Sequence, residues 1–336
     1  MPEQIDYLPW DHKDWFRESL AWIQDQTGHN GLTVSGVVEK HQIRPWSAVL
    51  RVPTNAGGLY FKASAPAFHH EAALTQALAS WRPDLLPHIY AADSQSGLLL
   101  MADGGPTLRS FLGADHYLAH WRRILPLYAE FQIEMAGRLD DLLAAGAIDR
   151  RLKTLPGQLV ELLTDQDALL INRPDGLTAG QFTYLRDIVP TFVGMCAALE
   201  SYGLPETLHH DDFHGNNICV GDDGYLFFDW GESCVAHPFF TMVVTLRAIA
   251  YFCKLSSDSP VLAELRDIYL KPWTGFTGCQ DLVLAYDLAN QIGKVNRALT
   301  WYRLVSDSPE PYRSEEAASV PGWLSGFLAD PAIPPC

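Results

Sequence analysis

Residues 208–218 read Leu-His-His-Asp-Asp-Phe-His-Gly-Asn-Asn-Ile, and residues 227–231 read Phe-Phe-Asp-Trp-Gly. The first stretch contains the spacing His-x-Asp-x-x-x-x-Asn at His210, Asp212 and Asn217, and the second places Asp229 after an apolar run. The residues between them form two short strand-like runs around a Gly-Asp-Asp-Gly turn, which predicts a hairpin. Such a hairpin would bring Asn217 and Asp229 side by side.

Phosphoryl transfer to a hydroxyl group requires this set of side chains. One carboxylate orients the hydroxyl and accepts its proton, while a carboxylate and an amide oxygen hold Mg²⁺ against the transferring phosphate. Asp and Asn supply the hard oxygen ligands that suit Mg²⁺. The pattern therefore predicts Asp212 as the catalytic base and Asn217 and Asp229 as magnesium ligands of an ATP-dependent small-molecule kinase.

These motifs resemble those of the aminoglycoside-phosphotransferase branch of the protein-kinase-like fold, which also includes choline and homoserine kinases. Members carry a pattern close to His-Gly-Asp-Leu-His-Pro-Gly-Asn, followed by an Asp ahead of Trp or Phe. This chain departs at Asp211 and at Gly215-Asn216, which leaves the reacting positions unchanged. The resemblance covers roughly residues 33–305. It implies a bilobal α+β fold with a small antiparallel-sheet N-lobe and a larger, mostly helical C-lobe.

The N-lobe part of the sequence supplies an independent check. Lys62 ends a strand-like run, where burial would penalise an unpaired ammonium group. A kinase uses a lysine at this place to bind the nucleotide phosphates. Its expected partner is a glutamate on the following helix, and Glu71 fits that role. The order lysine, glutamate, catalytic loop and second Asp supports the kinase reading.

The resemblance also implies where the rest of the nucleotide binds. Residues 98–105 look like the strand and hinge that contact adenine, which assigns Met101 and Asp103 to nucleotide binding. The loop between the first two strands contains no glycine. Ser47, at the end of that loop, is therefore expected to bind phosphate through its hydroxyl and backbone.

Changes in sequence texture predict the organisation of the chain. Residues 1–32 are expected to form an N-terminal helical segment that packs on the lobes. Residues 33–103 contain three strand-like runs, a helix and two more strand-like runs, and form the predicted N-lobe. Residues 104–336 form the predicted helical C-lobe, with continuous helices expected over 116–146 and 179–202. Ligands commonly bind in the cleft between two such lobes.

Composition narrows the possible partners. The chain has 336 residues, and 24 Lys and Arg against 40 Asp and Glu give a net charge of −16. This charge argues against nucleic acid and anionic membranes as partners. The acidic first residues lack the apolar segment of a secretory signal. The sequence contains no C-x-x-C pair, so a structural zinc site is not expected. The six cysteines are scattered along the chain, which indicates reduced thiols. We expect a cytoplasmic monomer or homodimer.

The acceptor is less well determined by the sequence. An acidic chain suits a cationic hydroxyl compound such as an aminoglycoside, an amino sugar or an amino alcohol. The expected acceptor wall consists of Asp211, Glu232, Asp287 and Gln291, the last two lying on one face of a predicted helix. Only seven residues separate Asp229 from the next predicted helix, which leaves no room for the peptide-docking segment of a protein kinase.

Two other functions remain open at this point. The chain could be a pseudokinase that binds nucleotide without turnover. However, the lysine, the glutamate, the catalytic-loop motif and the second Asp of an active kinase are all present. The histidines at positions 209, 210 and 214 beside two aspartates could also form the metal site of a hydrolase, since His and Asp together suit zinc or iron. Their spacing differs from the His-Glu-x-x-His helix pair of metalloproteases.

Overall fold

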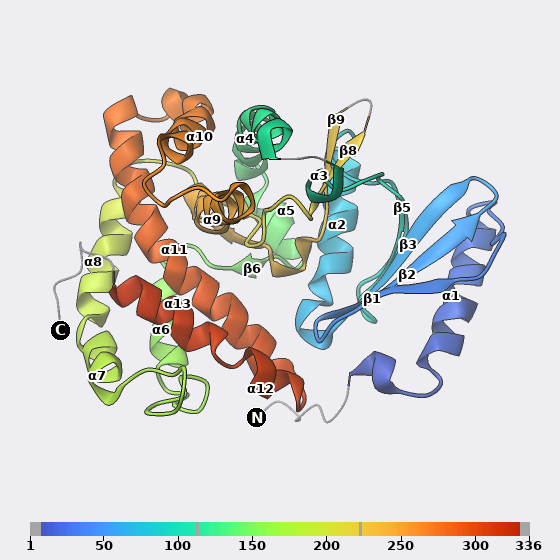
Figure 1. Ribbon diagram of the computed structural model, residues 1–336, viewed down its shortest axis with the longest axis horizontal. Helices are drawn as coiled ribbons and strands as arrows, with labels where there is room; N and C mark the ends of the chain where they lie inside the picture. The colour runs from blue at the N-terminus through green and yellow to red at the C-terminus, as the bar shows by residue number, and fades with distance from the viewer. Residues whose placement is uncertain (1–7, 112–113, 222–223, 330–336) are drawn as a thin grey trace.

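The computed structural model describes residues 8–111, 114–221 and 224–329. Its N-terminal part is a five-stranded antiparallel sheet in the order β1-β2-β3-β5-β4 (Figure 1). The strands are β1 (Glu39–Ile43), β2 (Ser47–Thr54), β3 (Gly57–Ser64), β4 (Ile89–Asp93) and β5 (Leu98–Ala102). The predicted order of three strands, one helix and two strands is confirmed, because α2 (His70–Trp81) lies between β3 and β4 in the sequence.

Alternation along β3 gives this sheet two different faces. Phe61 is fully buried and packs against Trp15 and Trp22 of α1 (Trp15–His29), with ring centroids 6.4 and 5.5 Å apart. Successive strand residues point to opposite faces, so Lys62 points away from α1. The N-terminal helix therefore covers one face of the sheet and leaves the Lys62 face for the cleft.

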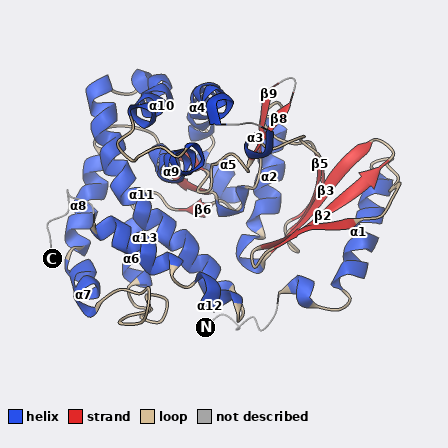
Figure 2. Ribbon diagram, viewed as in Figure 1, coloured by secondary structure: helices blue, strands red, loops and turns tan. Residues whose placement is uncertain are grey.

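The C-terminal part is mostly helical and occupies the left of Figure 2, where the helices are blue. Its helices are α3 (Leu108–Phe111), α4 (Ala114–Ala136), α5 (Leu139–Ala144), α6 (Leu155–Leu162), α7 (Ala179–Asp187), α8 (Val189–Glu200), α9 (Thr241–Cys253), α10 (Pro260–Leu270), α11 (Cys279–Asp307), α12 (Tyr312–Glu316) and α13 (Ser319–Leu328). The α+β, kinase-like fold class is thereby confirmed. No helix among the described residues is long and apolar enough to cross a membrane.

Two of the predicted continuous helices are interrupted. The predicted helix over 179–202 divides into α7 and α8 at Ile188, because Pro190 has no backbone N–H and takes its place in the first turn of α8. The predicted helix over 116–146 ends at Ala136 and restarts as α5 after Gly137 and Arg138. Helical periodicity alone does not register these short interruptions.

The loop that carries the motif from His210 to Asn217 is called here the catalytic loop. Small strands and aromatic rings hold it in place within the helical lobe. β7 (Thr207–His209) leads into the loop and pairs with β10 (Cys234–Ala236), which also pairs with β6 (Ile148–Asp149). Inside the loop, the ring of Phe213 stacks on Tyr128 of α4 at 4.0 Å and meets Phe227 edge-on at 5.2 Å. All three rings are fully buried, so the loop backbone rests on rigid packing.

The predicted hairpin follows the catalytic loop. It consists of β8 (Ile218–Gly221) and β9 (Gly224–Phe227), and its register pairs Ile218 with Phe227. The predicted turn residues 222–223 lie outside the described residues. Phe228 N–H donates to the carbonyl of Asn217 at 3.1 Å, which extends the pairing by one residue and positions Asp229 immediately beyond it.

Candidate active site

A cavity of about 760 Å³ lies between the N-lobe sheet and the hairpin, and is called here the main cavity. Most of the predicted site residues line it. From the N-lobe these are Ser47, Lys62, Met101 and Asp103, and from the C-lobe they are Asp212, Asn217 and Asp229. Residues far apart in the sequence are therefore brought to one concave surface, as expected for a ligand site.

Lys62 joins the two lobes through ion pairs. Its Nζ lies 2.6 Å from Glu71 Oε1 and 2.6 Å from Asp229 Oδ1. Lys62 is 7% exposed and Glu71 is 2% exposed. Burial opposes the charge of Lys62, but Asp229 and Glu71 together raise its pKa above the usual lysine range. The ammonium group therefore stays charged, and its direction is fixed by two carboxylates.

Glu71 is itself held by its surroundings. Ser64 Oγ donates to Glu71 Oε2 at 2.8 Å. A Cβ atom placed on Gly231 would lie 3.1 Å from the same oxygen, so a larger residue there would force the carboxylate to shift by a few tenths of an ångström. Burial raises the pKa of Glu71, and Lys62 opposes that shift. Glu71 is therefore held in place and keeps the ammonium group of Lys62 in a fixed position.

Asp229 adopts an unusual backbone conformation. Its φ of 68° and ψ of 60° lie in the left-handed region, which costs a residue other than glycine on the order of 1 kcal/mol or more. The conformation turns the chain sharply after β9 into the short turn Trp230–Glu232. It also lets the carboxylate of Asp229 face Lys62 across the cavity.

Three groups hold the carboxylate of Asp212. Asn217 Nδ2 donates to Asp212 Oδ2 at 3.1 Å, and His214 Nε2 lies 3.2 Å from the same oxygen. Arg297 Nη2 lies 3.4 Å from Oδ1. Burial would raise the pKa of Asp212, but the hydrogen bond from His214 and the charge of Arg297 hold it well below its usual range. Asp212 is therefore ionised at neutral pH.

The neighbouring histidines have structural positions. His210 Nδ1 accepts from Asp212 N–H at 3.2 Å, which leaves Nε2 as donor to the carbonyl of Phe228 at 3.1 Å. Burial lowers the pKa of His210 to about 4, so the ring is neutral. His209 Nδ1 lies 2.7 Å from Thr241 Oγ1. Both rings thus tie the catalytic loop to its surroundings.

Asp211 belongs to a network behind the loop rather than to a cavity wall. His209 Nε2 lies 2.9 Å from its Oδ1, and Thr300 Oγ1 donates to its Oδ2 at 2.5 Å. Asp211 is 2% exposed and lines neither of the two cavities described here. Burial would raise its pKa, but Arg297 and His209 lower it to about 2. The expectation that Asp211 meets the acceptor has no geometric support.

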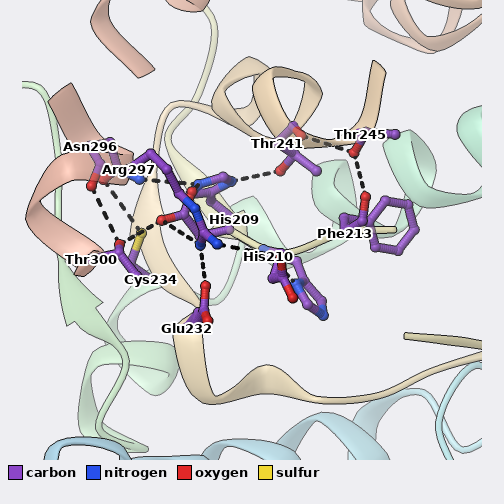
Figure 3. A network of polar contacts seen from close by, with 12 residues as sticks. His209, His210, Phe213, Glu232, Cys234, Thr241, Thr245, Asn296, Arg297 and Thr300 are labelled. Atoms are coloured by element: carbon purple, nitrogen blue, oxygen red, sulfur yellow. Dashed lines mark hydrogen bonds and ion pairs between the residues drawn. The ribbon is translucent and has the colours of Figure 1, made fainter. Parts of the chain in front are cut away.

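Arg297 is the main functional residue that sequence reasoning missed. It projects from α11 toward Glu232 and pairs with Glu232 Oε2 through Nη1 (Figure 3). The same Nη1 lies 3.6 Å from Asp211 Oδ2. Burial raises the pKa of Glu232 to about 7, and the guanidinium acts in the opposite direction. The available signal was Arg297 close to the apolar residues Val295, Ala298 and Leu299 of a predicted helix, which indicates a buried charge that needs a partner.

The other two predicted acceptor residues lie elsewhere. Asp287 is exposed, and neither Asp287 nor Gln291 lines either cavity. Asp287 precedes Arg297 by ten residues on α11, which corresponds to about 15 Å along the helix axis. The structure therefore does not bring this pair together with Asp212.

The end of the main cavity predicted to hold the nucleotide is built from β3, β5 and the hinge. Met101 lines it beside Tyr60, its partner across the sheet. Asp103 Oδ1 accepts from the N–H of Gly105, and Asp103 N–H donates to the carbonyl of Gly58. Ser47 lies where β2 begins, and its N–H already donates to the carbonyl of Arg44 at 3.3 Å. Its hydroxyl is thus the group left for a ligand.

The donor set of the cavity fits a magnesium ion. Asn217 uses Nδ2 to donate to Asp212, so its remaining side-chain polar atom is the oxygen Oδ1. Asp229 binds Lys62 through Oδ1 and keeps Oδ2. Amide and carboxylate oxygens are the ligands that Mg²⁺ prefers. This candidate site has one amide and one carboxylate. A different kind of metal site, a cluster of three or more His, Cys, Asp or Glu side chains, does not occur within residues 8–111, 114–221 and 224–329.

Comparisons with solved structures support the fold. An ethanolamine kinase from Plasmodium vivax aligns with a TM-score of 0.62 and 12% identity, over 96% of this chain and 90% of that one. A choline kinase from Streptococcus pneumoniae aligns with a TM-score of 0.58 and 10% identity, over 92% of this chain and 99% of that one. A macrolide 2′-phosphotransferase from Brachybacterium faecium aligns with a TM-score of 0.55 and 14% identity, over 89% of this chain and 97% of that one. At these identities the likeness concerns the fold.

Sequence comparison identifies the family. No curated protein sequence matches this chain. The profile of the phosphotransferase enzyme family, however, matches residues 38–274, which include the N-lobe sheet, the catalytic loop and the hairpin. With the ion pairs of Lys62 and the arrangement of Asp212, Asn217 and Asp229, this match leads to one conclusion: the chain belongs to the phosphotransferase enzyme family.

Proposed function

We propose that the chain is an ATP- and Mg²⁺-dependent kinase that phosphorylates a hydroxyl group of a small molecule. The observation that carries this proposal is the pair of 2.6 Å contacts from Lys62 to Glu71 and Asp229, in the cavity that Asp212 and Asn217 also line. Lysine, metal-ligand carboxylate and base thus converge on one space, as phosphoryl transfer requires. The family match supports a phosphotransferase.

The N-lobe residues bind and orient the nucleotide. Lys62 presents a fixed positive charge to the phosphates, because Glu71 and Ser64 keep it from moving. Met101 and Asp103 contact the base and the hinge side of the nucleotide, and Ser47 offers its hydroxyl to the phosphates. Asn217 and Asp229 would hold Mg²⁺, which would supply positive charge against the negative charge that develops on the phosphate.

Asp212 orients the acceptor and takes its proton. The acceptor oxygen forms a bond to the γ-phosphorus while the bond from that phosphorus to the bridging oxygen breaks, and ADP leaves. The acceptor proton passes to Asp212. Because His214 and Arg297 keep the pKa of Asp212 low, the carboxylate is a weak base that accepts the proton late. The carboxylate therefore serves both to orient the hydroxyl and to take up its proton.

The alternative functions have less support. A hydrolase centred on the histidines would need ring nitrogens aimed at a shared point, but His209 and His210 use theirs on Thr241, Asp211 and backbone groups. A pseudokinase would be expected to lack one of the core groups. Here Lys62 and Asp229 are paired across the cavity, and Asp212 lines it.

The test is ADP formation against a panel of hydroxyl compounds, with aminoglycosides, amino sugars, amino alcohols, nucleosides, neutral sugars and polyols. The best acceptor is then assayed with Asp212→Asn, which keeps the size of the side chain but cannot accept a proton. We expect turnover to fall by about 10²–10⁴-fold while ATP binding persists. Asp187→Asn, at the exposed end of α7, is the matched control and should behave as wild type.

Three outcomes would contradict the proposal. Near-wild-type turnover of Asp212→Asn would remove Asp212 from the mechanism. Hydrolysis that proceeds without ATP and is stimulated by zinc would support a hydrolase instead. Nucleotide binding with no ADP formation for any acceptor in the panel would favour the pseudokinase.

A further inference from the structure

A second cavity of about 130 Å³, called here the inner cavity, adjoins the main cavity. Four residues line both cavities and so form the shared wall: Trp46, Lys62, Asp212 and Asp229. The inner cavity is completed by Phe68, Glu71, Gly231, Glu232, Arg297 and Trp301. An acceptor whose hydroxyl reaches Asp212 from the C-lobe side would place its reacting end here.

The inner cavity has the groups that usually bind a cationic ligand, namely a carboxylate and an aromatic face. Both are already used by the chain itself. The guanidinium of Arg297 lies over the ring of Trp301, 5.5 Å from its centroid, and pairs with Glu232. Arg297 is 5% exposed and lies 3.4 Å from Asp212. Figure 3 shows it reaching from α11 toward Glu232.

The remaining carboxylates of this region are also paired. Glu71 and Asp229 both bind Lys62. Asp211 binds His209 and Thr300. A cationic acceptor would therefore have to displace a buried guanidinium from carboxylates that surround it, leaving charges without partners. Protonation of Glu232 would leave the guanidinium in place and make the cavity less acidic still.

We infer that Arg297 makes the inner cavity a pocket for an uncharged polyhydroxyl acceptor and excludes cationic hydroxyl compounds. This inference rests on the proposed kinase function. The N–H groups of Arg297 donate hydrogen bonds to acceptor hydroxyls, and the oxygens of Glu232 accept them. Trp46, whose ring meets that of Trp301 edge-on at 6.5 Å, supplies an apolar face for the carbon skeleton. Sugars and polyols combine these two properties.

A matched pair of probes isolates the charge. Choline and 3,3-dimethylbutan-1-ol have the same shape and the same primary hydroxyl, but only choline carries a positive charge. Dissociation constants for both are measured by ligand-observed NMR, with Mg²⁺ and a non-hydrolysable ATP analogue present. For wild type we expect choline to bind no more tightly than the neutral alcohol. For Arg297→Met we expect choline to bind about tenfold more tightly, with the neutral alcohol changed less than about twofold.

Arg297→Lys is the matched control, because it keeps the positive charge and should keep the wild-type ratio. Arg297→Gln replaces Arg297→Met if the apolar variant does not fold. The ratio of the two dissociation constants in wild type can be measured whether or not either variant folds. Choline binding tenfold more tightly than the neutral alcohol in wild type would overturn the inference. An unchanged ratio in both neutral variants would also overturn it. Because these are binding measurements, they remain decisive even if ADP formation fails and the kinase proposal falls.

Discussion

Asp211 illustrates how a residue beside the proposed catalytic base can serve the fold instead of the ligand. It follows His210 in the motif, yet its carboxylate points to His209 and Thr300 behind the loop. Its partners are positions 209, 297 and 300, so it ties the catalytic loop to α11. The position occupied by glycine in the resembling family is thus used here to lock the loop in place.

The pKa of Asp211 leads to a prediction about stability and pH. Its pKa of about 2 in the folded protein lies below the ordinary value of 3.8. The resulting stabilisation is therefore present above pH 4 and is lost as the pH falls toward 2. Asp211→Asn should be less stable than wild type at pH 6, and this difference should narrow by about 1 kcal/mol at pH 3. Urea unfolding at both pH values measures the two differences.

Asp187→Asn provides the control for this experiment. Asp187 is exposed at the end of α7, so the stability difference between this variant and wild type should be near zero at both pH values. A destabilisation of Asp211→Asn that stays the same from pH 6 to pH 3 would show that the carboxylate charge contributes nothing to the network.

At the scale of elements, the turn Trp230–Glu232 and α2 control the position of Lys62. The backbone of Gly231 passes close to Glu71, which lies in the first turn of α2. This contact links the C-lobe turn after Asp229 to the N-lobe helix. A small displacement of either element would therefore change how Glu71 holds Lys62.

Gly231→Ala tests this link. The added methyl group would lie 3.1 Å from Glu71 Oε2, so the glutamate must shift and loosen its contact with Lys62. We expect turnover to fall several-fold and stability to fall by about 1 kcal/mol. Gly322→Ala in α13 is the matched control, because its methyl group meets nothing within 4 Å. It should leave turnover unchanged and raise stability by about 0.5–1 kcal/mol. Equal effects of both substitutions would refute the link.

Sequence reasoning succeeded where the relevant residues are close in the chain. Asp212 and Asn217 lie five residues apart, and a single hairpin connects Asn217 to Asp229, so local spacing predicts their arrangement. Lys62 and Glu71 are nine residues apart, on a strand and the helix after it. Such local relationships are encoded in turns and periodicity.

Predictions from the sequence failed where long-range packing determines which residues meet. Arg297 meets Glu232 across 65 residues, and no local pattern specifies which face of α11 turns toward the cleft. Asp287 and Gln291 were placed on one face of this helix by their spacing, but neither lines a cavity. The rotation and depth of a long helix follow from the packing of its whole length, which periodicity does not give.

At the scale of the whole molecule, the two lobes are joined at the cleft by Lys62 with Asp229 and by the edge-on rings of Trp46 and Trp301. The net charge of −16 belongs to the whole chain and says little about the inner cavity, where Arg297 offsets the nearby carboxylates. The expectation of a cationic acceptor rests on this global charge and stays a prediction, whereas the local pairing of charges sets what the cavity can bind.

The central claim is that the cleft binds a nucleotide together with Mg²⁺, and calorimetric titration with ATP tests it most directly without any knowledge of the acceptor. We predict binding in the presence of Mg²⁺, weakening at least about tenfold with EDTA, and loss of this magnesium dependence in Asp229→Asn, because one carboxylate cannot be spared from so few ligands. Asp187→Asn should match wild type. Absence of ATP binding at millimolar concentration, or equal binding with Mg²⁺, with EDTA and in Asp229→Asn, would contradict the account.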